Sequence, residues 1–420
     1  MTEPTIIPAP DSIRHEKISP EALRVIRHLQ QNDFQAYLAG GGVRDLLLHR
    51  HPKDFDIATS AHPNQVRKIF RNCRLIGRRF RLAHIIFHNH IVEVATFRTL
   101  VSASEAEPDL SSASRDAAVE MRADTPPHVP HGAFRAREGL ILRDNVFGTA
   151  EQDAWRRDFT INGLFYDPEA HQVIDYVGGL PDIERRIIRV IGDPLVRFRE
   201  DPVRMVRAVR FAAACDCTIE PAADRAILAM CDQLALASPN RMYEEVLKLF
   251  ASGAAEGVFR HLIRTGLFNV LFADAGAWLR SSEGHAALPR IYHALHQMDV
   301  WKKHGQAINP ALAWSLAFGP YHEHRAAALI RRGLKLAPAL AQATFDHLLG
   351  LASRVQVFRS VIRDASLIMA AQPLFETTQG ARADRFRTRH YFGDALVYLK
   401  LRVAFTGQHR ELLHWWQQRI

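Results

Sequence analysis

Two aspartates separated by one residue, Asp54 and Asp56, are the side chains of this sequence whose type and spacing best suit chemistry. Side chains alternate between faces along a strand, so we expect both carboxylates on one face and Phe55 and Ile57 toward the core. Carboxylates on one face repel unless a cation lies between them, and hard oxygen ligands suit Mg²⁺ or Mn²⁺. The pair predicts a metal site for phosphoryl or nucleotidyl transfer.

A glycine-rich turn with Gly40 and Gly41 precedes this pair, and Arg44 follows the glycines. Glycine lets a backbone approach a phosphate closely, and a helix N-terminus offers N–H groups to an anion. A cation in the first turn of a helix opposes the helix dipole, which makes sense if Arg44 faces a triphosphate. The glycines form neither G-x-G-x-x-G nor a P-loop. Alone, each motif fits a tight turn or a solvated strand, but their combination favours a nucleotide site.

Hydrophobic periodicity predicts the elements that position these residues. A helix is expected after an extended arm, with Ser19 as its N-cap. Strands are expected over 35–40 and 54–59, helices over 42–49 and 62–71, and a hairpin over 84–98 that turns at His88–Asn89. From Asp216 onward the pattern predicts only helices. The expected class is therefore α+β, a mixed sheet with helices followed by an all-α region.

The same patterns divide the chain into four expected segments. They are an N-terminal arm and helix (1–34), an α/β head (35–180) with a mobile insertion (99–139), a helical neck (181–250), and a helical body with a C-terminal region (251–420). The insertion is expected because that stretch is rich in Ser, Ala, Glu, Asp and Pro.

Composition narrows the class of partner. The formal net charge is +9, with 54 Lys and Arg against 45 Asp and Glu, and the pI is about 9.6. That excess favours a polyanion, with RNA or DNA ahead of a membrane surface. Four cysteines match neither a zinc pattern nor a disulfide framework. The cysteines are therefore expected to be reduced thiols of a cytoplasmic protein, and we expect no membrane span and no signal peptide.

An ordered set of motifs resembles a known family. The set comprises LAGGGVRDLLL with PKDFDIAT, then VEVATFR, DAWRRDFTINGLFYD, DYVGGLPDIERRIIRVIG and FREDPVRMVRAVRFAA. It resembles the class II branch of the polymerase-β nucleotidyltransferase superfamily, which holds CCA-adding enzymes and bacterial poly(A) polymerases. The resemblance implies a five-stranded head and helical neck and body regions that hold RNA.

The resemblance also implies roles in the head. Asp158 would be the third catalytic carboxylate beside the aspartate pair, with Glu93 as its rival on a neighbouring strand. Either carboxylate could instead pair structurally with an arginine. Arg157 and Asn162 would join Gly40, Gly41 and Arg44 in binding the nucleotide.

A third motif, REDPVRMVRAVRF, predicts a helix capped by Asp201 with Pro202 at its first position. Arg204, Arg207 and Arg210 recur every three residues, so they share one stripe and an anion between them is expected. Ion pairs with the body are the alternative. By resemblance, Asp201 and Arg204 read the edge of the incoming base, and Arg207 lies nearer the triphosphate. Arg210 completes the nucleotide-binding set.

Three details favour the polymerase side of this branch: GRRFRLAH after the aspartate pair, RMYEEVLKLF, and the Trp-Trp ending LLHWWQQRI. The function implied is template-independent transfer of AMP from ATP to RNA 3′ ends, which promotes RNA turnover. Expected partners are mRNA, small RNA, tRNA precursors and RNA-degradation proteins. CCA addition to tRNA is the alternative enzyme function, and an inactive RNA-binding relic is the alternative outside catalysis.

Overall fold

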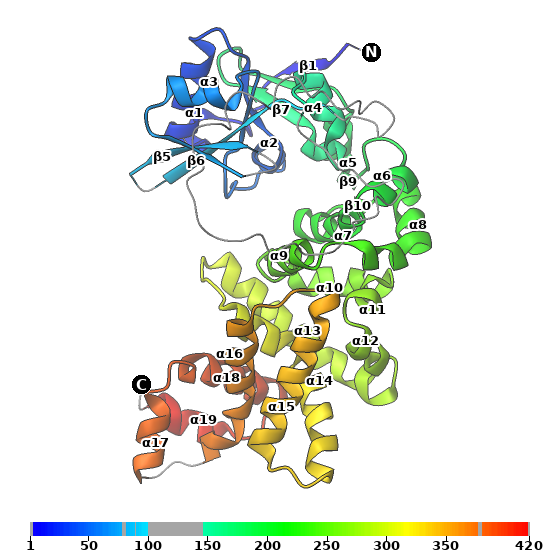
Figure 1. Cartoon of the computed structure of the whole chain (residues 1–420), viewed down its shortest axis with the longest axis vertical. Coiled ribbons are helices and arrows are strands. Elements are labelled where there is room, and N and C mark those ends of the chain that lie inside the picture. Colours follow the sequence, from blue (N-terminus) through cyan, green and yellow to red (C-terminus); the bar gives the residue numbers. More distant parts are fainter. Residues whose placement is uncertain (1–2, 78–80, 89, 100–145, 377–379, 419–420) are drawn as a thin grey trace, which may run out of the picture. The chain divides into compact units, whose positions relative to one another are not determined.

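The computed structural model describes residues 3–77, 81–88, 90–99, 146–376 and 380–418. The chain forms two compact units, Met1–Arg185 with Arg189–Asp201, and Arg186–Ile188 with Pro202–Ile420. The first unit is built on a sheet and the second on helices (Figure 1). Apart from Thr99, the expected insertion lies outside the described residues, as does Asn89 in the expected hairpin turn.

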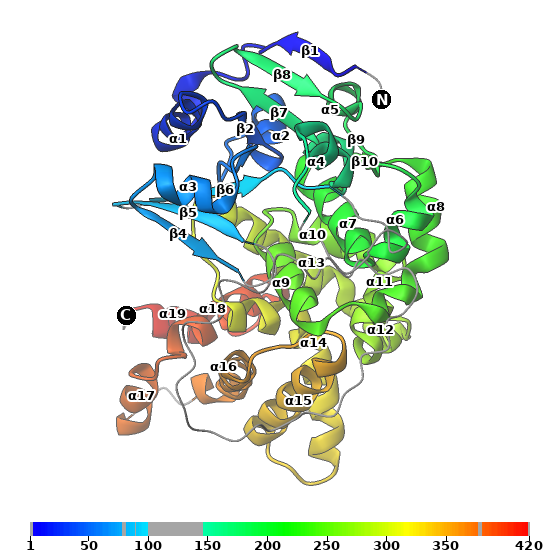
Figure 2. The same cartoon turned by 45° about the horizontal axis from the view of Figure 1, so that its top comes forward.

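The first unit contains a mixed sheet. Its described strands are β1 (Thr5–Pro8), β2 (Ala36–Ala39), β3 (Ile57–Thr59), β4 (Cys73–Ile76), β5 (Leu82–Phe87), β6 (His90–Thr96), β7 (Leu164–Asp167) and β8 (Gln172–Asp175). Their order is β1-β8-β7-β2-β3-β6-β5-β4 (Figure 2). Strands β3 and β6 pair in parallel, and the other described neighbours are antiparallel.

This described sheet has eight strands rather than the five that the resemblance implied. The N-terminal arm accounts for one of them, because Thr5 to Pro8 pair with Asp175 to Gln172 and make β1 an edge strand. The segment Cys73–Ile76 adds β4 at the opposite edge. Both are short edge strands, which are hard to recognise from a local pattern because only one neighbour constrains them.

Helices complete the first unit. They are α1 (Pro20–Gln30), α2 (Gly41–Leu47), α3 (Pro63–Ile69), α4 (Ala150–Arg156), α5 (Gly179–Arg185) and α6 (Pro194–Glu200). The predicted start of α1 is confirmed, because the Ser19 hydroxyl accepts a hydrogen bond from the Ala22 N–H at 3.3 Å. The core includes Phe97, Phe165 and Ile174. Phe97 directly follows β6, Phe165 lies in β7 and Ile174 lies in β8, so this core holds these three strands together.

The second unit is helical, as expected. Its helices are α7 (Val203–Cys215), α8 (Pro221–Met230), α9 (Pro239–Phe250), α10 (Ala255–Arg264), α11 (Leu267–Leu271), α12 (Ala273–Leu279), α13 (Ser282–Lys303), α14 (Pro310–Arg331), α15 (Leu336–Gly350), α16 (Arg359–Ala370), α17 (Gly380–Arg387), α18 (Phe392–Thr406) and α19 (Arg410–Gln417). One exception is a parallel pair of strands, β9 (Ile187–Ile188) with β10 (Thr218–Ile219). Because β10 follows Asp216, the expectation of helices alone after Asp216 was wrong for Thr218 and Ile219. The rings of Phe250, Trp314 and Phe318 pack in its core.

The C-terminal tryptophan pair and the polarity of the long helices complete the description of the fold. Trp416, in the Trp-Trp ending, is buried, and its indole N–H donates to the Phe375 carbonyl oxygen at 2.8 Å, so this side chain packs in the core. In the part of the chain that the structure describes, the longest helices are too polar to cross a membrane.

A buried histidine pair lies inside the second unit. The Nε2 atom of His322 on α14 lies 2.9 Å from Nδ1 of His347 on α15. Burial lowers the pKa of His347 to about 3, with Arg325 adding repulsion, and burial holds the pKa of His322 well below its usual value. Both rings are therefore neutral at neutral pH.

This pair predicts a steep acid dependence of stability. Below the unfolded-state pKa near 6.5 the unfolded chain binds protons that the native rings refuse, so the unfolding free energy falls as pH falls. Each ring contributes a slope of about 1.4 kcal/mol per pH unit between roughly pH 6 and pH 4. The His347→Gln variant should lose one such contribution in urea unfolding measured across that range.

The exposed His285→Gln variant is the matched control for loss of a histidine. Equal slopes for His347→Gln and the original chain would contradict the assignment of the pair as a neutral buried unit.

Candidate active site

The aspartate pair lies directly before a strand rather than within it. Strand β3 begins at Ile57, so the prediction of a strand over 54–59 was wrong at its start, and strand alternation does not orient Asp54 and Asp56. The partner strand β2 ends at Ala39 because the chain turns at Gly40. The last hydrogen bond toward the aspartate pair runs from the Ala39 N–H to the Asp56 carbonyl oxygen, at 3.0 Å. Both aspartates are exposed.

Glu93 is the carboxylate that the sheet places beside this pair. Strands β3 and β6 run parallel, with Ile57 opposite Val94. Asp56 directly precedes Ile57 and Glu93 directly precedes Val94, so the two carboxylates occupy corresponding positions on neighbouring chain segments. The pKa of Asp56 is raised to about 6, chiefly because surrounding protein displaces water, then because of the charges of Glu93 and Asp54. The residue nevertheless keeps an exposed surface. Arg157 opposes the shift.

The chemistry of these carboxylates fits a divalent cation. Burial is the main cause of the raised pKa of Asp56, and the repulsion from Glu93 and Asp54 that adds to it is the part a bound cation would relieve. Hard carboxylate oxygens are the ligands that Mg²⁺ prefers. No cluster of three or more His, Cys, Asp or Glu side chains that could hold a metal ion occurs among the described residues. Asp54 and Asp56 remain the ligands predicted from the sequence, and both are exposed.

Gly40 shapes the turn that leads into α2. Its φ of +65° lies in the left-handed region that favours glycine. A Cβ atom built there would lie 2.6 Å from Nη1 of Arg157, so a side chain would also displace that guanidinium. A Cβ on Gly41 would make only an ordinary contact, 3.6 Å from Nη2 of Arg44. Of the two predicted glycines, the backbone geometry therefore requires Gly40.

Arg44 is buried and carries defined partners. Its Nε and Nη2 atoms donate to Oδ1 of Asp45 at 2.9 and 2.8 Å, and Nη1 donates to Oδ1 of Asn162 at 2.8 Å. Asp45 thus compensates the charge that would otherwise oppose the dipole of α2. Asn162 in turn donates to Oδ1 of Asp158 at 3.1 Å. The predicted residues Arg44, Asn162 and Asp158 form one hydrogen-bonded chain.

Sequence reasoning missed Asp153, which organises the two arginines of this region. Its buried carboxylate binds Arg156 at 2.6 Å and Arg157 at 2.9 Å. Burial alone would raise its pKa, but the charges of Arg157 and Arg156 outweigh burial and hold the pKa below its usual value. A carboxylate three and four residues before two arginines on a helix is the signal that could have revealed these pairs.

Arg157 is fixed from three sides. Besides Asp153, its Nη1 donates to the Asn162 carbonyl oxygen at 3.1 Å, and its guanidinium lies 5.1 Å from the centre of the Phe165 ring. Buried Arg197 donates from Nη2 to the carbonyl oxygens of Arg156 and Arg157, both at 2.8 Å. No sequence pattern pointed to Arg197, because its contact is with backbone distant along the chain.

The motif REDPVRMVRAVRF divides between the two units. Asp201 ends α6, because its N–H donates to the Arg197 carbonyl oxygen at 3.2 Å, and Pro202 takes the N-cap position of α7. The prediction that Asp201 caps this helix, with Pro202 at its first position, was therefore wrong by one residue. Arg204 in α7 is buried.

The arginine stripe of α7 meets a buried carboxylate within the second unit. Glu245 on α9 lies 3.5 Å from Nη1 of Arg207 and 3.3 Å from Nη2 of Arg210. Burial would raise the pKa of Glu245, but the charges of Arg207, Arg210 and Lys248 outweigh it and lower that pKa. The ion-pair alternative thus describes these two arginines, and Glu245 is a second carboxylate that sequence reasoning missed.

Family models match three stretches of the chain. Residues 36–189 match the poly A polymerase head domain, 216–279 match a probable RNA and SrmB-binding site of polymerase A, and 332–420 match the polymerase A arginine-rich C-terminus. The head model covers the aspartate pair, the glycine turn and the Asp153 cluster.

Known proteins agree with these models. Poly(A) polymerase I of Salmonella typhi is 38% identical over 99% of this chain and 85% of its own length. The CCA-adding enzyme of Geobacillus thermodenitrificans is 35% identical over 63% of this chain and 58% of its own length. A crystal structure of the Bacillus stearothermophilus CCA-adding enzyme with CTP superposes with a TM-score of 0.65 at 27% identity, covering 96% of this chain and 83% of that one. This chain therefore belongs to the poly(A) polymerase family, in the nucleotidyltransferase superfamily that also holds the CCA-adding enzymes.

Proposed function

We propose that this protein is a template-independent polynucleotide adenylyltransferase that adds AMP from ATP to RNA 3′ ends. The observation that carries this function is the similarity to poly(A) polymerase I along 99% of the chain, including the C-terminal stretch 332–420. The similarity to a CCA-adding enzyme covers 63% of the chain. RNA and nucleotide binding follow from membership of the family, and the expected RNA classes and RNA-degradation partners belong to this proposal.

In the proposed reaction the RNA 3′-hydroxyl gives its proton to the third carboxylate, its oxygen bonds to the α-phosphorus of ATP, and the bond to pyrophosphate breaks. Asp54 and Asp56 would hold Mg²⁺ or Mn²⁺, which supplies positive charge to the reacting phosphate when bound. We propose Glu93 as the third carboxylate, since its charge reaches Asp56. Asp158 is instead assigned a positioning role through Asn162 and Arg44.

The cationic side chains would hold the triphosphate. Arg157 is suited to this role because Asp153, the Asn162 carbonyl and Phe165 fix its guanidinium before any ligand binds. Gly40 and Gly41 would present the backbone to a phosphate, beside Arg44 and Asn162.

Base recognition is assigned to Asp201 and Arg204, whose hydrogen bonds would select adenine. Glu245 holds Arg207 and Arg210 and would keep the same face of α7 in place, with Arg207 nearer the triphosphate. The four cysteines are free thiols, which supports a reducing compartment and the proposed cytoplasmic location.

Primer extension tests the proposed function. With Mg²⁺ and ATP alone, the purified protein should extend oligo(A) into a long ladder, and Asp54→Asn and Asp56→Asn should abolish extension while RNA binding remains. Two cytidines and one adenosine added only to tRNA that lacks its terminal CCA would assign the protein to CCA addition. Failure to extend either primer would support the relic.

The two candidate third carboxylates predict different kinetics. Glu93→Gln should lower kcat by about a hundredfold or more, since an acidic group near the metal ligands is lost, with little change in KM for ATP. Asp158→Asn keeps a hydrogen-bond acceptor for Asn162 and should cost about tenfold or less. Steady-state kinetics with oligo(A) compare the two variants, and the reverse ranking would return the catalytic role to Asp158.

Gly40→Ala should harm both stability and nucleotide use. The left-handed backbone and the contact with Arg157 should lower the unfolding free energy by about 1–3 kcal/mol and kcat/KM for ATP by about a hundredfold. Gly41→Ala is the matched variant, because its Cβ makes an ordinary contact, so its melting temperature should not change. Thermal melting and ATP kinetics measure both, and equal melting temperatures would refute the steric role of Gly40.

A further inference from the structure

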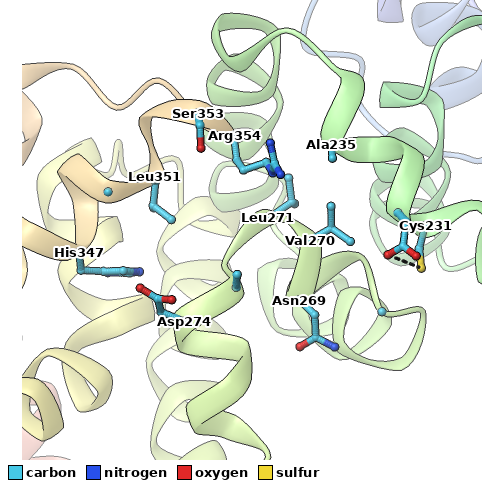
Figure 3. Close-up of a pocket in the computed structure, with 14 residues that line it drawn as sticks. Cys231, Ala235, Asn269, Val270, Leu271, Asp274, His347, Leu351, Ser353 and Arg354 are labelled. Atoms are coloured by element: carbon cyan, nitrogen blue, oxygen red, sulfur yellow. Dashed lines mark hydrogen bonds between the residues drawn. The ribbon is translucent and has the colours of Figure 1, made fainter.

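A pocket in the second unit is separate from the catalytic residues discussed above. It has a volume of about 580 Å³, within the range of small-ligand sites. One wall comes from the 3₁₀ helix Cys231–Leu236 with α11 and α12, and the other from the end of α15 with the 3₁₀ helix Leu351–Ser353. Figure 3 shows Val270 and Asn269 on the first wall and His347 and Leu351 on the second.

His347 offers this pocket an unsatisfied hydrogen-bonding atom. The residue is only 3% exposed, and Figure 3 shows its ring pointing from α15 toward the pocket. Its Nδ1 is occupied by His322, whereas its Nε2 has no hydrogen-bond partner among the described residues. This nitrogen is itself almost fully covered, so a ligand reaches it only when the ring turns outward, and pairing with it then removes the cost of an unpaired buried atom.

The charge state of His347 narrows the ligand group that can meet it. Burial lowers the pKa of this imidazole to about 3, so the ring is neutral at neutral pH. Its Nε2 then donates or accepts one hydrogen bond, according to the tautomer shared with His322. An uncharged polar edge, such as that of a nucleobase, matches this atom better than an anion does.

The remaining lining supplies the other groups that a nucleotide needs. Arg354 is exposed, and its side chain forms no ion pair or hydrogen bond with any residue that the structure describes. Asp274 presents a largely exposed carboxylate, 3.8 Å from Arg325. Val270 and Leu271 provide apolar surface. The pocket therefore combines a cation for phosphate, an acceptor for an amino group and a surface for a flat ring.

We propose that this pocket binds one nucleotide, with its base between Val270 and His347, its amino group toward Asp274 and its phosphate at Arg354. The favoured source is an unpaired nucleotide of the RNA substrate, because single-stranded RNA is recognised through splayed bases. The wall residues Cys231–Leu236, α11 and α12 also fall within the stretch that matches a probable RNA-binding model. A free nucleotide shares this chemistry. The inference rests on the proposed function only in expecting RNA as a ligand.

Binding of fluorescein-labelled oligo(A) to the full-length protein, at fixed salt and without divalent metal, tests the proposal. Ala235→Trp fills the pocket without changing charge, and Arg354→Ala removes the cation. Each should weaken binding by about tenfold. Arg359→Ala removes an arginine that is also exposed but lies outside the pocket lining, and it should change affinity by less than about twofold. Thermal melting checks that the variants fold.

Photocrosslinking separates the two nucleotide sources. Oligo(A) carrying 8-azidoadenosine should label peptides within 231–236, 266–274 or 347–354 if RNA enters the pocket. Labelling there by free 8-azido-ATP alone would assign the pocket to a free nucleotide. Unchanged oligo(A) affinity in both pocket variants, with no crosslink from either probe, would overturn the proposal.

The outcome is independent of catalysis. Failure of AMP transfer together with pocket-dependent RNA binding would count against the proposed function alone. Normal AMP transfer together with RNA binding that ignores the pocket would count against this inference alone.

Discussion

The geometry of the catalytic region depends on one buried carboxylate. Asp153 binds Arg156 and Arg157 and holds both guanidiniums against the protein instead of leaving them free in solvent. Arg157, fixed in this way, contacts the space beside Gly40, binds the Asn162 carbonyl and carries its charge to Asp56. A buried charge is stable only when it is paired. Asp153 is therefore stabilised by Arg156 and Arg157, and it fixes the orientation of both guanidiniums in return.

The same principle recurs on α7. Three arginines on one helical stripe repel each other. The buried carboxylate of Glu245 reduces this repulsion because it pairs with Arg207 and Arg210. In each unit an acidic side chain inside the protein orients basic side chains that we propose bind phosphate. Cations that are already oriented lose less freedom when a phosphate arrives, which favours both affinity and transition-state stabilisation.

The two buried polar groups differ in whether their hydrogen-bonding atoms all have partners. Around Asp153 each guanidinium is bound, so the cluster is complete as it stands. In the histidine pair, by contrast, Nδ1 of His322 and Nε2 of His347 both lack partners among the described residues, and His347 lines a pocket. Native proteins seldom leave buried polar atoms unsatisfied, and we propose that a ligand supplies the partner that the structure does not give His347.

The sequence alone determined the chemistry of this protein and most of its order along the chain. Periodicity identified α1, β2, β6 and the helical second unit, because each of these elements buries a regular face. The ordered motifs identified the nucleotidyltransferase head and the aspartate pair. Local patterns carry this information because both side-chain spacing and motif order are properties of the chain itself.

Tertiary structure decided where these groups lie and which of them meet. Strand β3 starts only at Ile57 because its partner strand β2 ends at Ala39, and the edge strands β1 and β4 are each defined by pairing with a single neighbour, β8 or β5. Glu93 became a neighbour of Asp56 through the parallel pairing of β3 with β6. Asp153, Arg197 and Glu245 gained their roles through burial. Contacts between residues far apart in sequence depend on packing and desolvation, which no local pattern encodes.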